Sequence, residues 1–255
     1  MKPFIRVFDL ETTGFTPETA GVCEVARVDV EANGADLVCQ PIDWEVVHNI
    51  WSLFVHPGHP IPPETSAIHH IVDEDVAAAR PWAEEAPRLF YNGPVALAAH
   101  NAKFERQWIT DDLSGGLPWV CTYKCALRLW PDAPGHSNQT LRYWLKPEGL
   151  SREMSRFAHR AGPDAYVTAF LLREQLRLAN LEQLVAWSSE PALQVRCRIG
   201  KQRGMLWREV DDGFLRWVAD RDFDEDVIFT VRTEMARREA EAQADDDSAG
   251  MASPW

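Results

Sequence analysis

Three features are scarce in this sequence, and each scarcity narrows what the protein can be. No apolar run approaches the roughly 18 uninterrupted residues of a membrane-spanning helix, and the opening MKPFIRVFD has no apolar stretch of the length that a secretory signal needs. The five cysteines are odd in number, and Cys121 and Cys125 lack the two-residue spacing of a zinc knuckle. We therefore expect a cytoplasmic protein that starts near Met1, does not enter a membrane, and keeps its cysteines as reduced core thiols.

Positive charge is also scarce, since 26 Lys and Arg stand against 39 Asp and Glu and give a formal net charge of −13. Taken as an average, this balance argues against a nucleic-acid partner. The distribution weakens that argument, because the segment 195–208 carries Arg196, Arg198, Lys201, Arg203 and Arg208 without an acid. A local basic patch outweighs a global average within the Debye length. A nucleic-acid partner therefore stays open.

The chain has 255 residues, 45% of them hydrophobic, which is enough for one large domain and a small one. Strand-like runs at 4–10, 22–39 and 94–101 alternate with helical patterns at 81–91, 140–150 and 163–180, and Ala32-Asn33-Gly34 is typical of a hairpin turn. This alternation predicts an α/β fold. The expected divisions are a main domain at 1–180, a linker at 181–194, a small basic and aromatic unit at 195–238 and a disordered acidic tail at 239–255.

Two carboxylates stand at the end of the first strand-like run. Asp9 and Glu11 are two residues apart, so strand alternation points both side chains to the same face. Like charges this close destabilise each other unless one acid takes up a proton or a cation lies between them. The pair therefore indicates either a shared proton or a cation site.

Further polar residues follow other apolar segments. The run VALAAHNAKFER ends in His100 and Asn101 and places Glu105 on a first helical turn, and HRAGPD places His159 five residues before Asp164. Each has a plain interpretation as well: the two acids fit helix starts, where the dipole favours negative charge, and a lone histidine is most often part of a core or surface. Even Asp9 and Glu11 could form a strand-end salt-bridge site.

Together and in this order, these motifs resemble those of the DEDDh, or DnaQ-like, 3′→5′ exonucleases. DLETTG stands as the first motif with Asp9 and Glu11, HNAKFE resembles the second with Glu105, and HRAGPD fits the third with His159 and Asp164. The resemblance covers roughly residues 3–178 and includes the loop FVHPGHPIPPETSAIHHIVDEDV and the helix CTYKCALRLWP. It implies a ribonuclease H-like mixed sheet flanked by helices.

The resemblance also implies a catalytic set and two Mg²⁺ or Mn²⁺ ions, because all-oxygen ligands select hard cations. Asp9 would bridge both ions, Glu11 and Asp164 would complete the first, and Glu105 would support the second. His159 would act as the general base for the attacking water. These five residues are the expected catalytic residues, and the four acids are the expected metal ligands.

Contacts to the 3′-terminal nucleotide are implied for a further group of residues. Thr12, Thr13 and Gly14 would hold the terminal sugar, Phe15 would stack on or wedge beside the last base, and His70 with Ile71 would flank that base. The full substrate-binding set is Thr12, Thr13, Gly14, Phe15, His70, Ile71 and Asn101, although Asn101 is expected to orient its own loop. Phe15, His70 and Ile71 could equally be packing residues.

The sequence departs from the family pattern at one place and fixes the subgroup at another. The second motif normally ends in Asp, whereas this chain has Glu105. A sister group uses Tyr four residues before the last Asp, but that position is Arg160, which cannot act as a base at neutral pH. The retained histidine therefore indicates the histidine-using group.

The C-terminal stretch IGKQRGMLWREVDDGFLRWVADRDFDEDVIFTV resembles the small C-terminal domain of relatives of exodeoxyribonuclease X. That likeness favours DNA, although the unit could also only pack, and Trp207 is its one candidate stacking platform. The expected activity is metal-dependent 3′→5′ exodeoxyribonuclease action on 3′ ends of single-stranded or frayed DNA, releasing nucleoside 5′-monophosphates. The alternatives are an RNA-trimming exoribonuclease or oligoribonuclease and a non-catalytic nucleic-acid-binding accessory subunit.

Overall fold

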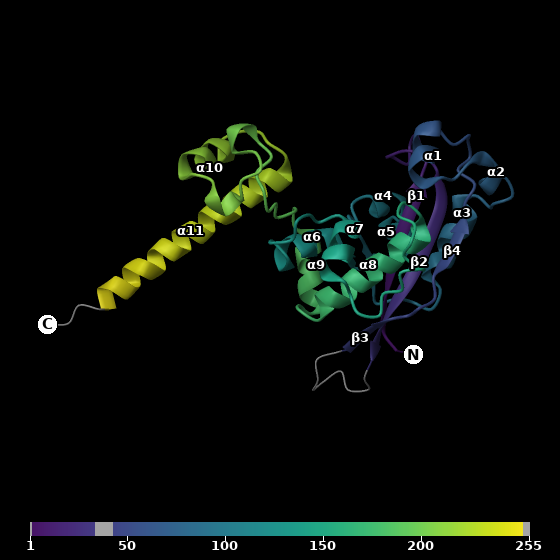
Figure 1. Ribbon diagram of the computed structural model, residues 1–255, viewed down its shortest axis with the longest axis horizontal. Coiled ribbons are helices and arrows are strands. Elements are labelled where there is room, and N and C mark those ends of the chain that lie inside the picture. The colour runs from purple at the N-terminus through teal and green to yellow at the C-terminus, as the bar shows by residue number, and fades with distance from the viewer. Residues whose placement is uncertain (1, 34–42, 252–255) are drawn as a thin grey trace. The chain divides into compact units, whose positions relative to one another are not determined.

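The computed structural model describes residues 2–33 and 43–251, with the side chains of 247–251 left aside (Figure 1). The chain divides into two compact units, 1–189 and 190–255. Each unit is considered by itself below.

The first unit is built on a six-stranded mixed sheet. The order is β3-β2-β1-β5-β6, with β4 also paired to β2. β2 runs antiparallel to β1, β3 and β4, whereas β1, β5 and β6 run parallel, which confirms the predicted mixed α/β sheet. The bounds are β1 Phe4–Thr12, β2 Val22–Asn33, β3 Asp43–Val46, β4 Trp51–Phe54, β5 Ala96–Ala99 and β6 Trp119–Cys121.

Both faces of β1 are buried, and the alternation of its side chains divides the core in two. Ile5 and Val7 pack with the helix α8 (Ala161–Leu176), while Phe8 and Leu10 pack on the opposite face. α8 is apolar almost all round because its other side packs against α6 (Thr122–Leu129) and α7 (Asn138–Leu145). The odd-numbered positions of β1 therefore face α8.

Short helices complete the first unit and differ in two places from the expected pattern. The helix predicted at 140–150 ends at Leu145, because Lys146 adopts a left-handed backbone and Pro147 follows it. The segment 81–91, predicted as one amphipathic helix, is an α-helical turn followed by a 3₁₀ helix, since Pro87 cannot continue the α-helical hydrogen bonding. The remaining bounds are α1 Pro63–His69, α2 Asp73–Val76, α3 Trp82–Glu85, η1 Ala86–Phe90, α4 Glu105–Trp108 and α5 Asp111–Ser114.

Three further expectations concern a hairpin, the cysteines and a membrane span. β2 pairs with β3 through Asn33 and Asp43, as in a hairpin, but the predicted return run and Cys39 lie outside the described residues. The four described cysteines, Cys23, Cys121, Cys125 and Cys197, are buried free thiols, as predicted. None of the helices in the described ranges is both long and apolar enough to cross a membrane.

The segment 181–194 was predicted as a linker, and the structure corrects this prediction. Most of it forms α9 (Leu181–Ser189), which packs on β6 and α6 and belongs to the first unit. Leu184 is fully buried, and the Ser188 hydroxyl accepts a hydrogen bond from the backbone N–H of Cys121 at 2.7 Å. The apolar spacing of Leu181, Leu184 and Val185 carried this signal, and the first unit extends to residue 189.

The second unit contains η2 (Gly200–Gln202), η3 (Trp207–Glu209), α10 (Asp212–Ala219) and α11 (Glu225–Met251) around a small core of its own. The predicted disordered tail from residue 239 is helical to Met251, because the Ala, Glu and Gln residues at 239–244 favour helix and continue α11. Trp207 is only 3% exposed and lies in this core, so it is not a stacking platform.

Candidate active site

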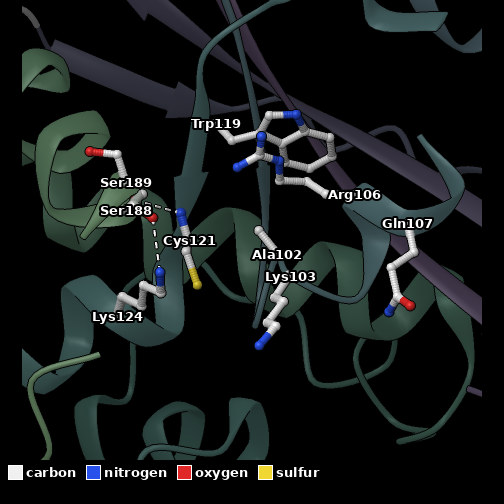
Figure 2. A pocket seen from close by; sticks show the side chains of 9 residues that line it. All are labelled: Ala102, Lys103, Arg106, Gln107, Trp119, Cys121, Lys124, Ser188 and Ser189. Carbon is white, nitrogen blue, oxygen red and sulfur yellow. Dashed lines mark hydrogen bonds between the residues drawn. The ribbon is translucent and has the colours of Figure 1, made fainter. Parts of the chain in front are cut away.

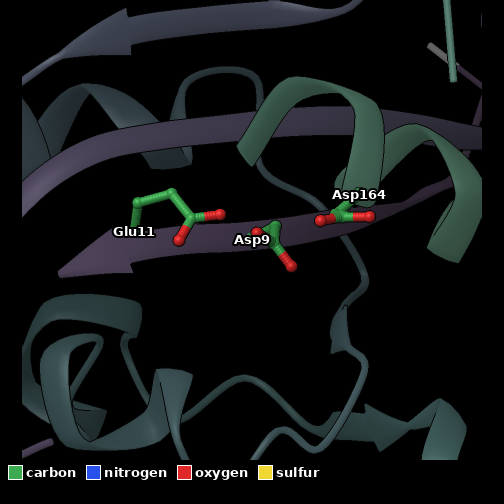
Figure 3. A group of neighbouring side chains, drawn as sticks. All are labelled: Asp9, Glu11 and Asp164. Atoms are coloured by element: carbon green, nitrogen blue, oxygen red, sulfur yellow. The ribbon is translucent and has the colours of Figure 1, made fainter. Parts of the chain in front are cut away.

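Three carboxylates meet beside the carboxyl end of β1. Asp9 and Glu11 continue the face of Ile5 and Val7, and α8 packs on that face with Asp164 in its first turn. One oxygen atom from each of Asp9, Glu11 and Asp164 lies within 4.8 Å of the others (Figure 3). The strand alternation and the docking of α8 together produce this acidic cluster.

Burial and mutual repulsion make the cluster electrostatically costly. Burial raises the pKa of Asp9 well above its usual value, and Glu11, Asp164 and Glu105 raise it further. Burial, followed by the charges of Asp164 and Glu24, raises the pKa of Glu11 from 4.5 to about 8. Burial and repulsion therefore favour the protonated forms of these acids unless positive charge compensates them.

Glu105 reaches the same region from the next parallel strand. β5 lies beside β1, and the chain passes from β5 through Asn101 into α4, whose first residue is Glu105. The side chain is 4% exposed, and its pKa is raised to about 8 by burial, with Glu11 adding to the shift. Glu105 lies outside the tight group of three, but it acts on the same charges.

The donor set fits a hard divalent cation. The Glu105 Oε2 atom is buried and has no hydrogen-bond partner in the described part of the chain. Buried carboxylate oxygens without partners are costly, and Mg²⁺ or Mn²⁺ would satisfy them. The four carboxylates supply only oxygen, which suits these ions better than zinc.

Asp164 is held in place by two hydrogen bonds, one to each of its oxygens. The backbone N–H of His159 donates to Oδ2 at 2.6 Å, and the Gln139 amide donates to Oδ1 at 2.8 Å. His159 adopts a left-handed backbone with φ of 58°, and its side chain is exposed. The loop therefore ties the histidine to the acidic cluster through its backbone and leaves the imidazole accessible.

A buried ion pair beside this cluster was missed by the sequence argument. Glu24 lies opposite Glu11 on β2 and accepts two hydrogen bonds from the Arg160 guanidinium, both at 2.9 Å. It also accepts from the backbone N–H of Ala161 at 3.0 Å and from the Ser52 hydroxyl at 3.1 Å. Arg160 and Ala161 thus anchor the start of α8 to the sheet. An acid inside the apolar run GVCEVARV was the available signal.

The predicted sugar contacts lie in the loop after β1, and two of them are used internally. The Thr12 hydroxyl donates to the Gly14 carbonyl at 2.6 Å, and the Thr13 hydroxyl accepts from the Gly21 N–H at 2.9 Å. Phe15 is 85% exposed, so the structure leaves its ring available.

The other predicted substrate residues differ in exposure. His70 ends α1 with φ of 60° and is exposed, whereas Ile71 is fully buried with Cys23 and Val76. The predicted base contact of Ile71 is therefore not supported, because the left-handed turn at His70 directs the next side chain inward. Asn101 is exposed, with φ of 71°, in the turn before α4.

Comparison with known proteins identifies the group. A family model described as exonuclease matches residues 7–172. The chain belongs to this exonuclease family. The resemblance inferred from the motifs is confirmed, and so is the assignment of the protein as an enzyme of the exonuclease class.

Individual relatives agree with this exonuclease assignment. Exodeoxyribonuclease 10 of Escherichia coli strain K12 is 34% identical over 219 residues, which cover 84% of this chain and 90% of that protein. The DNA polymerase III subunit epsilon of Treponema pallidum is 28% identical over 169 residues, covering 63% of this chain and 70% of that protein.

Solved structures show the same fold. Exonuclease X in complex with 5′ overhanging duplex DNA is 31% identical, covers 72% of this chain and 99% of that chain, and gives a TM-score of 0.55. Escherichia coli exonuclease I in complex with a dA16 oligonucleotide shares the fold at 16% identity, covering 73% of this chain and 43% of that chain with a TM-score of 0.51.

The raised carboxylate pKa values of this exonuclease predict how its stability depends on pH. Glu11 and Glu105 have pKa values of about 8 instead of 4.5, so folding favours their protonated forms. The stabilisation is complete below the unfolded pKa and is lost as pH rises through about 8. The unfolding midpoint of the protein in EDTA should fall as the pH rises from 4.5 to about 8 and level off above that, and Glu11→Gln should flatten that fall.

The exposed acid Glu84 provides the matched control. Glu84→Gln removes the same charge from α3 and should leave the fall in the unfolding midpoint as steep as in the parent. Thermal unfolding across the pH series gives the unfolding midpoints of the parent, Glu11→Gln and Glu84→Gln. Equal slopes for Glu11→Gln and Glu84→Gln would show that the cluster does not couple folding to protonation.

The Glu24–Arg160 pair predicts a second set of effects. Glu24→Gln should lower the free energy of unfolding by about 1–3 kcal/mol, because it leaves a partly buried guanidinium without its carboxylate. It should also weaken Mn²⁺ binding, since the start of α8 carries Asp164. Denaturant unfolding in EDTA measures the free energy of unfolding, and a separate titration with Mn²⁺ measures the metal affinity.

Arg160→Lys keeps the charge but loses the bidentate hydrogen bonding to Glu24. Its effects on stability and Mn²⁺ binding should therefore lie between those of the parent and of Glu24→Gln. Glu241→Gln breaks an exposed pair with Arg237 and should change stability by less than about 0.5 kcal/mol. Normal Mn²⁺ affinity in a destabilised Glu24→Gln variant would mean that the pair supports the fold without positioning the site.

Proposed function

We propose that this exonuclease is metal-dependent and removes nucleotides from the 3′ ends of DNA, single-stranded or frayed, as nucleoside 5′-monophosphates. The observation that carries the proposal is the convergence of Asp9, Glu11 and Asp164, with the partnerless Glu105 oxygen in electrostatic reach of them. DNA as substrate is supported by the names of the relatives, an exodeoxyribonuclease and an exonuclease X bound to duplex DNA.

Two ions, Mg²⁺ or Mn²⁺, fit this donor set best. Asp9, Glu11 and Asp164 would hold the first, and Asp9 with Glu105 would hold the second. When bound, the ions supply the positive charge that offsets the developing negative charge on the phosphate and on the departing 3′ oxygen. The protein's contribution is to hold four carboxylates in a rigid, largely dry site.

His159 is the proposed general base. Its backbone is fixed to Asp164, and its ring is exposed beside the cluster, so a ring nitrogen can take a proton from the attacking water. The protonated imidazole is then next to carboxylates, which stabilise its charge. Arg160, four residues before Asp164, is committed to Glu24 and does not compete for this role.

Thr12, Gly14 and Phe15 form the proposed grip on the terminal nucleotide. Their loop follows β1 directly and is closed by the bond between Thr12 and Gly14, so the sugar-binding backbone is preformed. The exposed Phe15 ring is available to stack on or wedge beside the last base. Exposed His70 and Asn101 complete the proposed rim of the site.

The second unit offers phosphate contacts. Arg196, Arg198, Lys201 and Arg203 are exposed on a turn whose ends are joined by a bridge between Arg196 and Leu206. Four exposed cations on one short turn favour backbone contacts that do not depend on base sequence. We propose that this turn adds non-specific affinity for the strand being degraded.

Digestion of DNA labelled at either end tests the proposal. With Mn²⁺ or Mg²⁺, a 5′ label should give a ladder of shortening products, and a 3′ label should appear at once as mononucleotide. EDTA should abolish both. His159→Ala should lower turnover by about 10²–10⁴-fold with little change in DNA binding.

A matched RNA oligomer in the same assay decides between the DNA and RNA alternatives. His56→Ala changes an exposed histidine in the loop after β4 and serves as the control for His159→Ala. Binding without any shortening of DNA would support the non-catalytic alternative. Turnover of His159→Ala within threefold of the parent would remove that residue from the mechanism.

The longer side chain of Glu105 predicts a metal preference. Compared with the family's aspartate, it adds a methylene and extends the carboxylate by about one C–C bond. Mg²⁺ demands near-ideal octahedral geometry, so a direct glutamate ligand should suit the larger Mn²⁺ better. The parent should be more active with Mn²⁺ than with Mg²⁺, and Glu105→Asp should stay within about tenfold of it while narrowing that preference.

Glu105→Ala should lose most turnover with either ion, whereas Glu64→Ala, at an exposed acid of α1, should not. Initial rates over a concentration series of each ion measure the effects. Near-parental rates in Glu105→Ala would place the ligands of the second ion elsewhere.

A further inference from the structure

A second polar site lies beside α4, the helix whose first residue is Glu105. It is a cavity of about 370 Å³ in the first unit, between the turn at 102–107, strand β6 and the end of α9 (Figure 2). Its lining residues are Ala102, Lys103, Arg106, Gln107, Trp119, Cys121, Lys124, Ser188 and Ser189. We call this cavity the α4–β6 pocket.

The charge of the α4–β6 pocket is opposite to that of the chain. Three of the nine lining residues, Lys103, Arg106 and Lys124, are basic and none is acidic, although the chain has a net charge of −13. Lys124 donates to the Ser188 carbonyl at 3.1 Å and so stays at the wall. Grouping of cations in a concave site favours binding of an anion.

Two of these cations keep donors available. Lys103 is exposed, and within the described residues Arg106 forms an ion pair with Asp111 at 3.9 Å, in which the two side chains are 49% and 71% exposed. An exposed pair at that distance contributes little and gives way easily. A guanidinium and an ammonium that line one pocket suit a phosphate, because the first can donate a forked pair of hydrogen bonds and the second supplies a point charge.

The α4–β6 pocket is close to the acidic cluster. Glu105 and Arg106 are neighbours in α4, and their side chains leave the helix about 100° apart. Cys121 lines the pocket, and its thiol pKa is raised mainly by burial and also by Glu105, while Lys124 lowers it. The Glu105 carboxylate and the Lys124 ammonium therefore both act on this thiol.

We propose that the α4–β6 pocket binds a backbone phosphate of the nucleic acid whose 3′ end lies at the acidic cluster. This proposal rests on the proposed function and adds a second contact point to it. The pocket would fix the direction of the strand, while the carboxylates act on its end.

A free phosphate, such as that of a released nucleoside 5′-monophosphate, offers the same chemistry to the pocket. A backbone phosphate brings the sugars on either side of it, and the cavity of about 370 Å³ has room for more than the phosphate group alone. The experiment therefore needs one arm with DNA and one with the monophosphate.

Salt dependence of DNA binding in EDTA tests the proposal without turnover. Affinity for a short labelled single strand is measured over a salt series for the parent, Lys103→Gln, Arg106→Gln and Arg177→Gln. Arg177 is an exposed residue after α8, paired with Glu174, so it gives the same loss of charge outside the pocket. Each lost phosphate contact should reduce the slope of log affinity against log salt by about 0.7.

Lys103→Gln and Arg106→Gln should each show this smaller slope and about tenfold weaker binding at low salt, whereas Arg177→Gln should match the parent. Equal slopes in all variants would overturn the proposal. A second outcome would replace the backbone phosphate with the free product as the ligand of the pocket. In that outcome the variants keep the parent's salt slope for DNA, whereas Arg106→Gln weakens binding of the nucleoside monophosphate. Metal-dependent digestion by the parent is scored separately, so failure of the proposed function is distinguishable from failure of the pocket.

Discussion

Repulsion among buried carboxylates is the constraint on which the rest of this structure depends. Asp9, Glu11 and Asp164 bring oxygens within 4.8 Å of one another, and burial raises the pKa values of all three. A site of this kind opposes its own ionisation in the folded chain, because water is excluded and like charges face each other. Protons can compensate this repulsion in the folded chain, and under the proposed function divalent cations would compensate it instead. The energy that opposes ionisation of the metal-free protein would then contribute to cation affinity.

The surrounding architecture holds this repulsion in place. The parallel pairing of β1 with β5 brings the end of the first motif close to Glu105, and the docking of α8 on the odd-numbered face of β1 brings Asp164. Glu24 and Arg160 then anchor the start of α8, while Gln139 and the backbone of His159 hold the Asp164 carboxylate. Outside this region, basic side chains line the α4–β6 pocket and the basic turn of the second unit. An acidic chain can approach a polyanion at such local patches even though its average charge disfavours the encounter.

A local rule was enough to pair Asp9 with Glu11, the family resemblance added Glu105 and Asp164, and non-local packing explains what both missed. Alternation along β1 predicted that Asp9 and Glu11 share a face, because strand geometry depends only on neighbours in sequence. The partner of Glu24 is 136 residues away, and only the tertiary fold brings it there. For Ile71, the family motif suggested a contact with the terminal base. The side chain is fully buried, because the left-handed turn at His70 directs it inward. The apolar face of α9 was visible as a pattern, but its burial required knowledge of the sheet edge it covers.

Calorimetric titration of the protein with Mn²⁺ near pH 7, in two buffers of different ionisation enthalpy, tests the central claim most directly. If the buried acids hold protons until cations replace them, binding must release protons, because Glu11 and Glu105 have pKa values of about 8 in the metal-free protein. The account predicts two bound ions and a net release of protons that shrinks as the pH is raised through that range. Binding without proton release, or with one ion only, would contradict it.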